Sequence, residues 1–319
     1  QLIGICGAGA IGKLWAYRLG ADNCLFISSR KTTKGEISKA RHNIDFEITK
    51  SHDADGESSQ LSIPLLSVTE ITHKTAHLNA VLICTKSYDA LEAALCLDKA
   101  LCASIPFVLF QNGLGSHQRI VGNLKTRKVF AASTTSGANI NTNGQLVLAG
   151  DGDTLIGALS HHSEGISSKR IKELLTQNLN REPSRDHQVE YSSNIEPILW
   201  KKLIINCGIN AFTALENVPN GEISQTQTFS TLWQELIREL SCLAPKAGIN
   251  ASEKEIETLI LDVAKNTGNN ISSMLQDVRA NKPTEIDDIN GYACKILRQQ
   301  NCSAHANQEL TRRVHALRD

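Results

Sequence analysis

The first half of the chain alternates short apolar runs with segments whose apolar residues recur at helical spacing. Residues 1–6 form an apolar run that is followed at once by glycines and by a helical segment ending near Leu19. Residues 80–84 are apolar throughout, as expected of a parallel strand covered on both faces. Further strand-like runs lie at 24–27, 107–110 and 129–131. Strands that alternate with helices predict a doubly wound α/β sheet.

Two other stretches predict antiparallel strands beside that sheet. The polar stretch 41–65 surrounds the loop 51–60 and is typical of a hairpin or of an excursion from the sheet. The runs 145–149 and 154–159 flank residues 150–153, which are alternating glycine and aspartate. Glycine and aspartate are common in tight turns, so we expect these two runs to pair as a hairpin.

The second half of the chain changes to helical periodicity from about Ile195 onward. Residues 200–215 predict one helix, and a second helix follows from the apolar stripe at positions 229, 232, 233, 236, 237 and 240. Ser252 is followed three positions later by Glu255, which is the spacing of a capping box at a helix start. This half therefore predicts an all-helical domain.

The length of 319 residues suits two domains better than one core, and 41% of the residues are hydrophobic. The polar segment 181–193 is the natural linker between the two halves. We therefore expect an α/β domain over residues 1–193 and an all-helical domain over residues 194–319.

Charge and cysteine content limit the classes of partner. Lys plus Arg equals Asp plus Glu, 33 each, which argues against a general binder of nucleic acid or of anionic membranes. No apolar run reaches the length of a membrane span. The nine cysteines are scattered without a CxxC pair, which favours reduced thiols and a cytoplasmic location. No metal-ligand pattern is recognisable.

A glycine-rich loop follows the first predicted strand and opens the first predicted helix. A GxGxxG loop in this position permits a tight turn, a close approach of backbone N–H groups to a pyrophosphate, and close packing of the helix on the strand. This context predicts a Rossmann-type domain that binds a dinucleotide. The six residues expected to bind the cofactor are Gly7, Ala8, Gly9, Ala10, Ile11 and Gly12.

The end of the second predicted strand discriminates between the two nicotinamide cofactors. An NAD site usually carries an acid there, which binds the ribose 2′-hydroxyl. This chain has Ser28, Ser29, Arg30 and Lys31 instead. Hydroxyls and a guanidinium suit a 2′-phosphate, so we expect NADPH and assign Arg30 to its phosphate. The alternative is that Arg30 and Lys31 are solvated loop charges.

Lys202, Asn206 and Asn210 are spaced to lie along one face of a helix whose other residues are mainly leucine and isoleucine. A helix that is apolar nearly all round is buried, so these polar groups must meet partners or face a polar cleft. Asparagines alone would fit a structural network inside the core. A lysine rarely joins such a network, because burying an ammonium is costly, and this favours Lys202 as an acid for ketone reduction.

Several separated motifs together resemble the ketopantoate reductase family, whose members are also called 2-dehydropantoate 2-reductases. They occur in the family's order along nearly the whole chain. The most specific is the segment SSMLQDVRANKPTEIDDING at residues 272–291. The others are the loop 7–12, the Thr-Lys pair at 85–86, the Gln-Asn-Gly-Leu-Gly sequence at 111–115, the helix 200–210 and the Pro-Asn-Gly sequence at 219–221.

The resemblance implies a role for each matching residue. NADPH would be bound by Lys86 and Asn112 in addition to Arg30 and the glycine loop, and Lys202 would donate the proton to the substrate carbonyl. Glu285 would belong to the catalytic network, where it would either position Lys202 or accept a hydrogen bond from the substrate hydroxyl. The substrate would be bound by Asn206, Asn210, Asn220 and Ser273. The chain departs from the family pattern at Ala211, where a proline is usual, and at Asn281-Lys282.

The implied reaction is the NADPH-dependent reduction of 2-dehydropantoate to (R)-pantoate on the route to pantothenate and coenzyme A. A small 2-oxo acid is the expected partner, and the chain is expected to act as a monomer or a homodimer. One alternative is a reductase of a different small 2-oxo acid on the same scaffold. Another is an NADPH-binding regulator without catalysis, against which the joint presence of Lys202, Ser273 and Glu285 argues.

Overall fold

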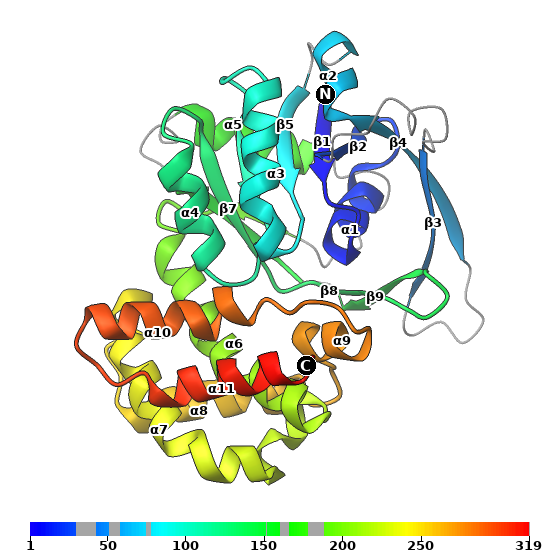
Figure 1. Ribbon diagram of the computed structural model, residues 1–319. Coiled ribbons are helices and arrows are strands. Elements are labelled where there is room, and N and C mark those ends of the chain that lie inside the picture. Colours follow the sequence, from blue (N-terminus) through cyan, green and yellow to red (C-terminus); the bar gives the residue numbers. More distant parts are fainter. Residues whose placement is uncertain are drawn as a thin grey trace. The chain divides into compact units, whose positions relative to one another are not determined.

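The structure of the protein is a computed structural model that describes residues 1–29, 43–50, 58–74, 78–150, 152–159, 166–177 and 188–318 (Figure 1). The chain divides into two units. The first is Gln1–Gln111 with His117–Ile195, and the second is Asn112–Ser116 with Glu196–Asp319. The short segment 112–116 therefore belongs to the second unit, although both of its neighbours along the chain belong to the first.

A doubly wound sheet forms the centre of the first unit. Six parallel strands stand in the order β4-β2-β1-β5-β6-β7, so that the chain builds outward from β1 first to one side and then to the other. This confirms the predicted fold class. The six strands are β1 (Leu2–Cys6), β2 (Cys24–Ser28), β4 (Ser59–Ser67), β5 (Leu78–Ile83), β6 (Phe107–Leu109) and β7 (Val129–Thr134).

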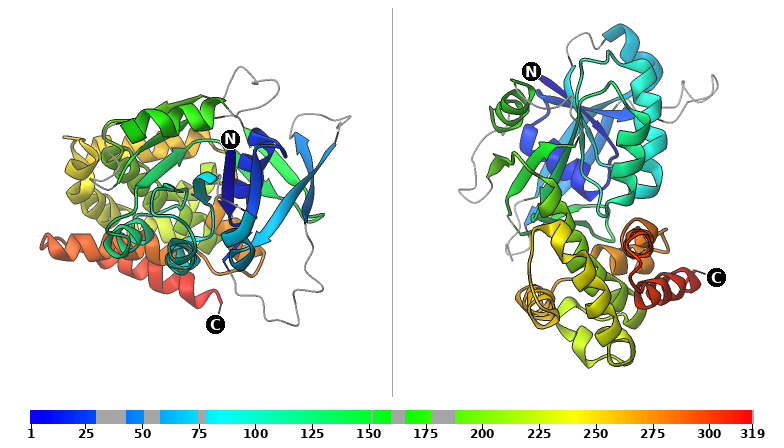
Figure 2. Two further views of the ribbon diagram at one scale, coloured as in Figure 1. Left: turned by 90° about the horizontal axis from the view of Figure 1, so that it is seen from above. Right: turned by 90° about the vertical axis from the view of Figure 1, so that its left-hand side faces the viewer.

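Both faces of the sheet are covered, and for this reason its central strands β1, β5 and β6 are mainly apolar. Alternate residues point to opposite faces, so Ile3 and Ile5 pack on one side and Leu25 and Ile27 on the other. The first face packs against α1 (Ala10–Leu19) and α5 (Ile166–Gln177). The second packs against α2 (Val68–Lys74), α3 (Ser87–Ala100) and α4 (Gly115–Asn123), as the two views of Figure 2 also show for α1 and α3.

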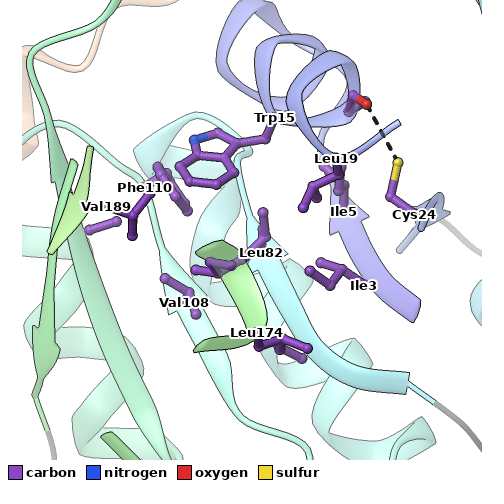
Figure 3. Packing of buried hydrophobic residues seen from close by; sticks show 14 of the residues in the cluster. Ile3, Ile5, Trp15, Leu19, Cys24, Leu82, Val108, Phe110, Leu174 and Val189 are labelled. Atoms are coloured by element: carbon purple, nitrogen blue, oxygen red, sulfur yellow. Dashed lines mark hydrogen bonds between the residues drawn. The ribbon is translucent and has the colours of Figure 1, made fainter. Parts of the chain in front are cut away.

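Trp15 on α1 fixes that helix against the sheet. Its ring centroid lies 5.1 Å from that of Phe110, among the buried side chains of β1, β5 and β6 (Figure 3). The thiol of Cys24 donates to the carbonyl oxygen of Gly20 at 3.3 Å, just beyond the end of the helix. The start of α1 is thereby held at the carboxyl end of β1, where the glycine loop lies.

The structure confirms one of the two predicted antiparallel pairs. The excursion after β2 contains β3 (Asn43–Lys50), which pairs antiparallel with β4. The segments 30–42 and 51–57 lie outside the described residues.

The hairpin predicted around residues 150–153 is wrong. The strands β9 (Leu146–Gly150) and β10 (Thr154–Ala158) exist, but they lie toward opposite ends of the strand order. The two edges of β9 are already paired, with β3 and with β8 (Gly137–Ile140), and β10 pairs with β7 and β11 (Val189–Tyr191). The tight turn lies instead between β8 and β9, where the amide of Gly144 donates to the carbonyl of Asn141.

The described residues of the second unit are helical apart from its connecting segments, as predicted. α6 contacts α7, α8, α9 and α11, so its apolar faces are buried in the middle of this unit. The capping box at Ser252 and Glu255 is present. The helices are α6 (Glu196–Glu216), η3 (Asn220–Gln225), α7 (Gln227–Leu243), η4 (Ala244–Ala247), α8 (Glu253–Asn266), α9 (Ser273–Arg279), η5 (Ile286–Asp288), α10 (Asn290–Gln299) and α11 (His305–Ala316).

α10 and α11 lie side by side, as Figures 1 and 2 show in orange and red.

Among the described residues, no helix combines the length and the apolar character that crossing a bilayer requires.

Candidate active site

The glycine loop has the geometry that a phosphate-binding turn needs. Gly7 has a φ of +107°, and a Cβ there would stand 2.5 Å from the backbone nitrogen of Thr85. A Cβ at Gly12 would overlap the carbonyl oxygen of Gly7, so this glycine lets α1 sit directly on the loop. Gly9 precedes the first helical residue, and a Cβ built on it meets no atom within 4 Å. The loop therefore leaves open space in front of the helix N-terminus, where an anion is stabilised.

Unpaired polar atoms lie at the carboxyl ends of β5 and β6, beside this loop. Gln111 donates through Nε2 to the carbonyl oxygens of Ile83 and Thr85, at 2.8 and 3.0 Å. Its Oε1 atom and the Oγ1 atom of Thr85 are buried without a hydrogen-bond partner among the described residues. Buried polar atoms are rarely left unpaired, and these two lie where a doubly wound fold binds its dinucleotide. The residues present thus fit a nicotinamide dinucleotide.

Of the two cationic residues assigned to the cofactor, the structure describes only Lys86. Lys86 lies at the N-cap of α3, directly after Thr85 at this edge of the sheet, and is half-buried. Arg30 and its neighbour Lys31 lie outside the described residues. β2 ends at Ser28, so the strand terminus carries a hydroxyl where an NAD site usually has an acid.

Lys202, Asn206 and Asn210 lie on α6 as the spacing predicted. Asn210 is 7% exposed, while Lys202 and Asn206 are half-buried. The remaining faces of the helix are buried against apolar side chains, among them Leu203 and Cys207. The polar groups therefore form a stripe on a helix held in place by its apolar sides.

The ammonium of Lys202 interacts with the carboxylate of Glu285, although the two residues lie far apart in the sequence. Burial lowers the pKa of Lys202 to about 8, and the negative charge of Glu285 acts in the opposite direction. Glu285 is 6% exposed and precedes η5. A lysine with this pKa stays mainly protonated at neutral pH yet releases its proton more readily than an exposed lysine does.

Asn112 joins this pair from the segment 112–116. Its Nδ2 donates to Oε2 of Glu285 at 3.5 Å, the outer limit of a hydrogen bond. The backbone brings it there, because Gly113 has a φ of +83° and lies so close to Asp288 that a Cβ would overlap the Asp288 carbonyl oxygen. The amide of Leu114 donates to the same oxygen at 3.1 Å. No role was predicted for Gly113 itself, although the Asn-Gly pair before a helix signals a special turn.

Thr213 and Ser272, for which no role was predicted, connect the start of α9 to the backbone of Asn210. The hydroxyl of Thr213 donates to the carbonyl oxygen of Asn210 and lies 2.6 Å from the hydroxyl of Ser272. Ser272 in turn caps α9 by accepting from the amide of Leu275. Ser273, the first residue of α9, directly follows Ser272 and is half-buried on a helix that packs against α6.

Asn220 is directed to a different part of the unit. Its Nδ2 donates to the hydroxyl of Thr267 at 2.9 Å, and its amide donates to the carbonyl oxygen of Asn270. These contacts hold η3 against the end of α8. Within the described residues its hydrogen bonds therefore do not reach Lys202, although its Oδ1 atom is buried without a partner.

Within the described part of the chain, no group of three or more His, Cys, Asp or Glu side chains could hold a metal ion.

Family models match both halves of the chain. The model described as Ketopantoate reductase PanE/ApbA matches residues 3–161, and the one described as Ketopantoate reductase PanE/ApbA C terminal matches residues 194–318. A 2-dehydropantoate 2-reductase of Vibrio cholerae is 25% identical over 98% of this chain and 96% of its own length. One of Shigella flexneri is 29% identical over 72% of this chain and 71% of its own.

Solved structures share the fold at low sequence identity. A PanE/ApbA family ketopantoate reductase from Ralstonia eutropha superposes with a TM-score of 0.78 at 22% identity, over 100% of this chain and 99% of that one. A D-mandelate dehydrogenase in a ternary structure with NADH and anilino(oxo)acetate has a TM-score of 0.77 at 20% identity, with the same coverage. A dimeric ketopantoate reductase from Staphylococcus aureus has a TM-score of 0.75 at 18% identity, again over 100% and 99% of the two chains. With both halves matched in order and the fold shared over its whole length, the chain belongs to the ketopantoate reductase family.

Proposed function

We propose that this oxidoreductase uses NADPH to reduce 2-dehydropantoate to (R)-pantoate, as a step toward pantothenate and coenzyme A. The observation that carries the proposal is the pair of the half-buried Lys202 and the buried Glu285, which supplies a proton donor with a pKa of about 8. The names of the relatives, 2-dehydropantoate 2-reductase, support the choice of substrate.

The residues of the first unit would hold the cofactor. The backbone of residues 7–12, with α1 behind it, would bind the pyrophosphate, and Lys86 would add a positive charge. Arg30 would pair with the 2′-phosphate, and the serine at the end of β2 carries no negative charge to repel that group. When bound, NADPH supplies the hydride that reduces C2 of the substrate.

Lys202 would supply the proton. Negative charge grows on the keto oxygen during reduction, and a fixed ammonium both stabilises that charge and protonates the oxygen. Burial makes the proton easier to release, and Glu285 keeps the amine protonated at neutral pH. After the transfer, the neutral amine regains its proton from water.

The remaining polar groups would orient the substrate. Asn206 and Asn210 follow Lys202 along α6, and Ser273 begins α9, which packs against α6. Their amides and hydroxyl can hydrogen-bond the carboxylate and the hydroxyl of a small 2-oxo acid. Asn112 would lie near both the nicotinamide and the substrate, as the family motif implies. Its side chain already donates to Glu285. Asn220 is retained as a substrate-binding residue on the family motif alone.

A second candidate is a reductase of a different 2-oxo acid. It is favoured by the D-mandelate dehydrogenase, which has the same fold at 20% identity and was solved with NADH and an oxo acid derivative. We also propose that the enzyme acts in the cytoplasm as a monomer or a homodimer, and the dimeric Staphylococcus aureus protein supports the latter. Light scattering on a size-exclusion column measures the assembly state.

A spectrophotometric assay of cofactor oxidation tests the proposal. Initial rates are measured with ketopantoate, benzoylformate and pyruvate, each with NADPH and with NADH. We expect kcat/KM to be highest for ketopantoate with NADPH, by about 100-fold or more over the other oxo acids. A preference for another oxo acid would overturn the substrate assignment in favour of the second candidate. Binding of NADPH without oxidation by any of the three would instead indicate a non-catalytic protein.

A further inference from the structure

A buried carboxylate joins α7 to the start of α11 in the second unit. Glu239 is 1% exposed and accepts four hydrogen bonds from the segment that opens α11. The amides of Ala306 and Asn307 donate to it at 2.8 and 3.0 Å, the side chain of Asn307 at 2.8 Å, and the hydroxyl of Ser303 at 3.2 Å. The connection between α10 and α11 is therefore fixed onto α7 at one point.

Two cysteines flank this junction. Cys242 follows Glu239 by three positions on α7 and so lies on the same face of that helix. Cys302 directly precedes Ser303, in the turn where Asn301 has a φ of +57°. The hydroxyl of Ser303 lies 3.2 Å from Oε1 of Glu239, so the junction brings Cys302 and Cys242 near each other, and each thiol is within range to influence the other. Cys242 is exposed and Cys302 is half-buried, so a small oxidant can reach them.

We propose that Cys242 and Cys302 form a reversible intramolecular disulfide when the protein meets a peroxide. In the first step one thiol is oxidised to a sulfenic acid, and the peroxide is reduced and releases water. The second thiol then attacks the oxidised sulfur, the S–S bond forms, and a second water leaves. A dithiol reductant reverses the reaction and restores both thiols.

The surroundings of Cys242 hold its thiol in the protonated form. Burial, the hydrogen bond with Cys302 and nearby carboxylates raise the pKa of Cys242 to about 11. Because the thiolate is the nucleophile, Cys242 reacts slowly with peroxide at neutral pH.

The disulfide would cross-link two segments of the helical unit that are far apart in the sequence. It would close a loop of roughly 60 residues, from α7 to the turn before α11, and so restrict the unfolded chain. No residue assigned to the reaction belongs to the pair, so the proposal stands apart from the proposed function.

Peptide mapping of the full-length protein tests the proposal. Wild type is treated with hydrogen peroxide, free thiols are blocked, and the protein is digested with trypsin without reduction. We expect the peptide 239–246 to be linked to the peptide 299–312, and the link to disappear with dithiothreitol. The melting temperature of the oxidised protein should rise by roughly 5 °C.

Variants separate this pair from the other thiols. Cys102 is also exposed, and the hydroxyl of Ser104 lies 3.1 Å from its thiol, so Cys102→Ser is the matched control and should keep both the link and the thermal shift. Cys242→Ser and Cys302→Ser should lose both. Mapping of the wild type and of Cys102→Ser decides the question even if another variant folds poorly. Absence of the linked peptide in these two proteins, or a link only between two chains, would overturn the proposal.

Discussion

The carboxylate of Glu285 sets the pH range in which Lys202 can donate a proton. Replacing Glu285 by Gln removes the charge and retains the shape of the side chain. Burial, the larger influence, still lowers the pKa of Lys202, and the opposing influence of the carboxylate is lost. The pKa of Lys202 should therefore fall below its value of about 8 in the wild type.

The size of this fall follows from the interaction of the two charges. An opposite charge at short range typically shifts a pKa by about 1–3 units, which places Lys202 of the variant between about 5 and about 7. At pH 7 the protonated fraction would drop from about 90% to between about 50% and about 1%. If Lys202 is the acid, hydride transfer at that pH should slow by about 2- to 100-fold.

Single-turnover rates of NADPH oxidation with ketopantoate, measured from about pH 5 to about pH 9.5, give this pKa directly. For the wild type the rate should be level below pH 8 and fall tenfold per unit above it. The descending limb of Glu285→Gln should lie about 1–3 units lower. Lys201→Ala is the control, since Lys201 is exposed and points about 100° away round α6. A folded Glu285→Gln enzyme whose limb stays at pH 8 or moves upward would refute the reasoning.

Four further substitutions test single residues. Lys202→Ala should lower turnover by roughly 10²–10⁴-fold, with the Kd for NADPH in a fluorescence titration unchanged; near-normal turnover would remove it as the proton donor. Arg30→Ala should weaken NADPH more than NADH by about 1–3 kcal/mol in the same titration, and equal losses would exclude it from the 2′-phosphate site. Ser273→Ala should raise the KM for ketopantoate by about 3- to 10-fold without affecting NADPH binding, whereas a loss of cofactor affinity would contradict a substrate contact. Gly113→Ala should destabilise the protein by about 1–3 kcal/mol in urea unfolding and reduce turnover, while Gly122→Ala, where a Cβ meets nothing within 4 Å, should do neither.

Local patterns predicted several elements of the fold, but not β8, β11, α2 or α5. The central strands of the first unit are buried on both faces, so their apolar runs stand out, and the helices of the second unit carry regular stripes and a capping box. Strand partners were harder to predict. The glycines and aspartates at 150–153 indicate a change of direction, but a turn signal does not say which edge the next strand joins. That choice depends on β3 and β7, which are distant in sequence.

In the candidate site, too, local features were predicted and contacts between distant residues were not. The spacing of Lys202, Asn206 and Asn210 on one helix predicted a polar stripe, because three positions on a regular helix fix a face. Nothing local indicates that Glu285 meets Lys202, and only the family resemblance suggested it. The contact of Gly113 with Asp288 could not be predicted, since it depends on where the segment 112–116 docks.

The placement of residues 112–116 has a consequence for recombination between family members. The chain passes between the two units at 111/112, at 116/117 and at 195/196. A chimera joined anywhere between residues 116 and 196 would take Asn112 from one parent and Glu285 from the other. The turn at Gly113 would then come from one parent, and the Asp288 carbonyl against which it packs would come from the other. One crossover in that range therefore separates the five-residue segment from the helices that it contacts, whereas a second crossover before residue 112 keeps them together.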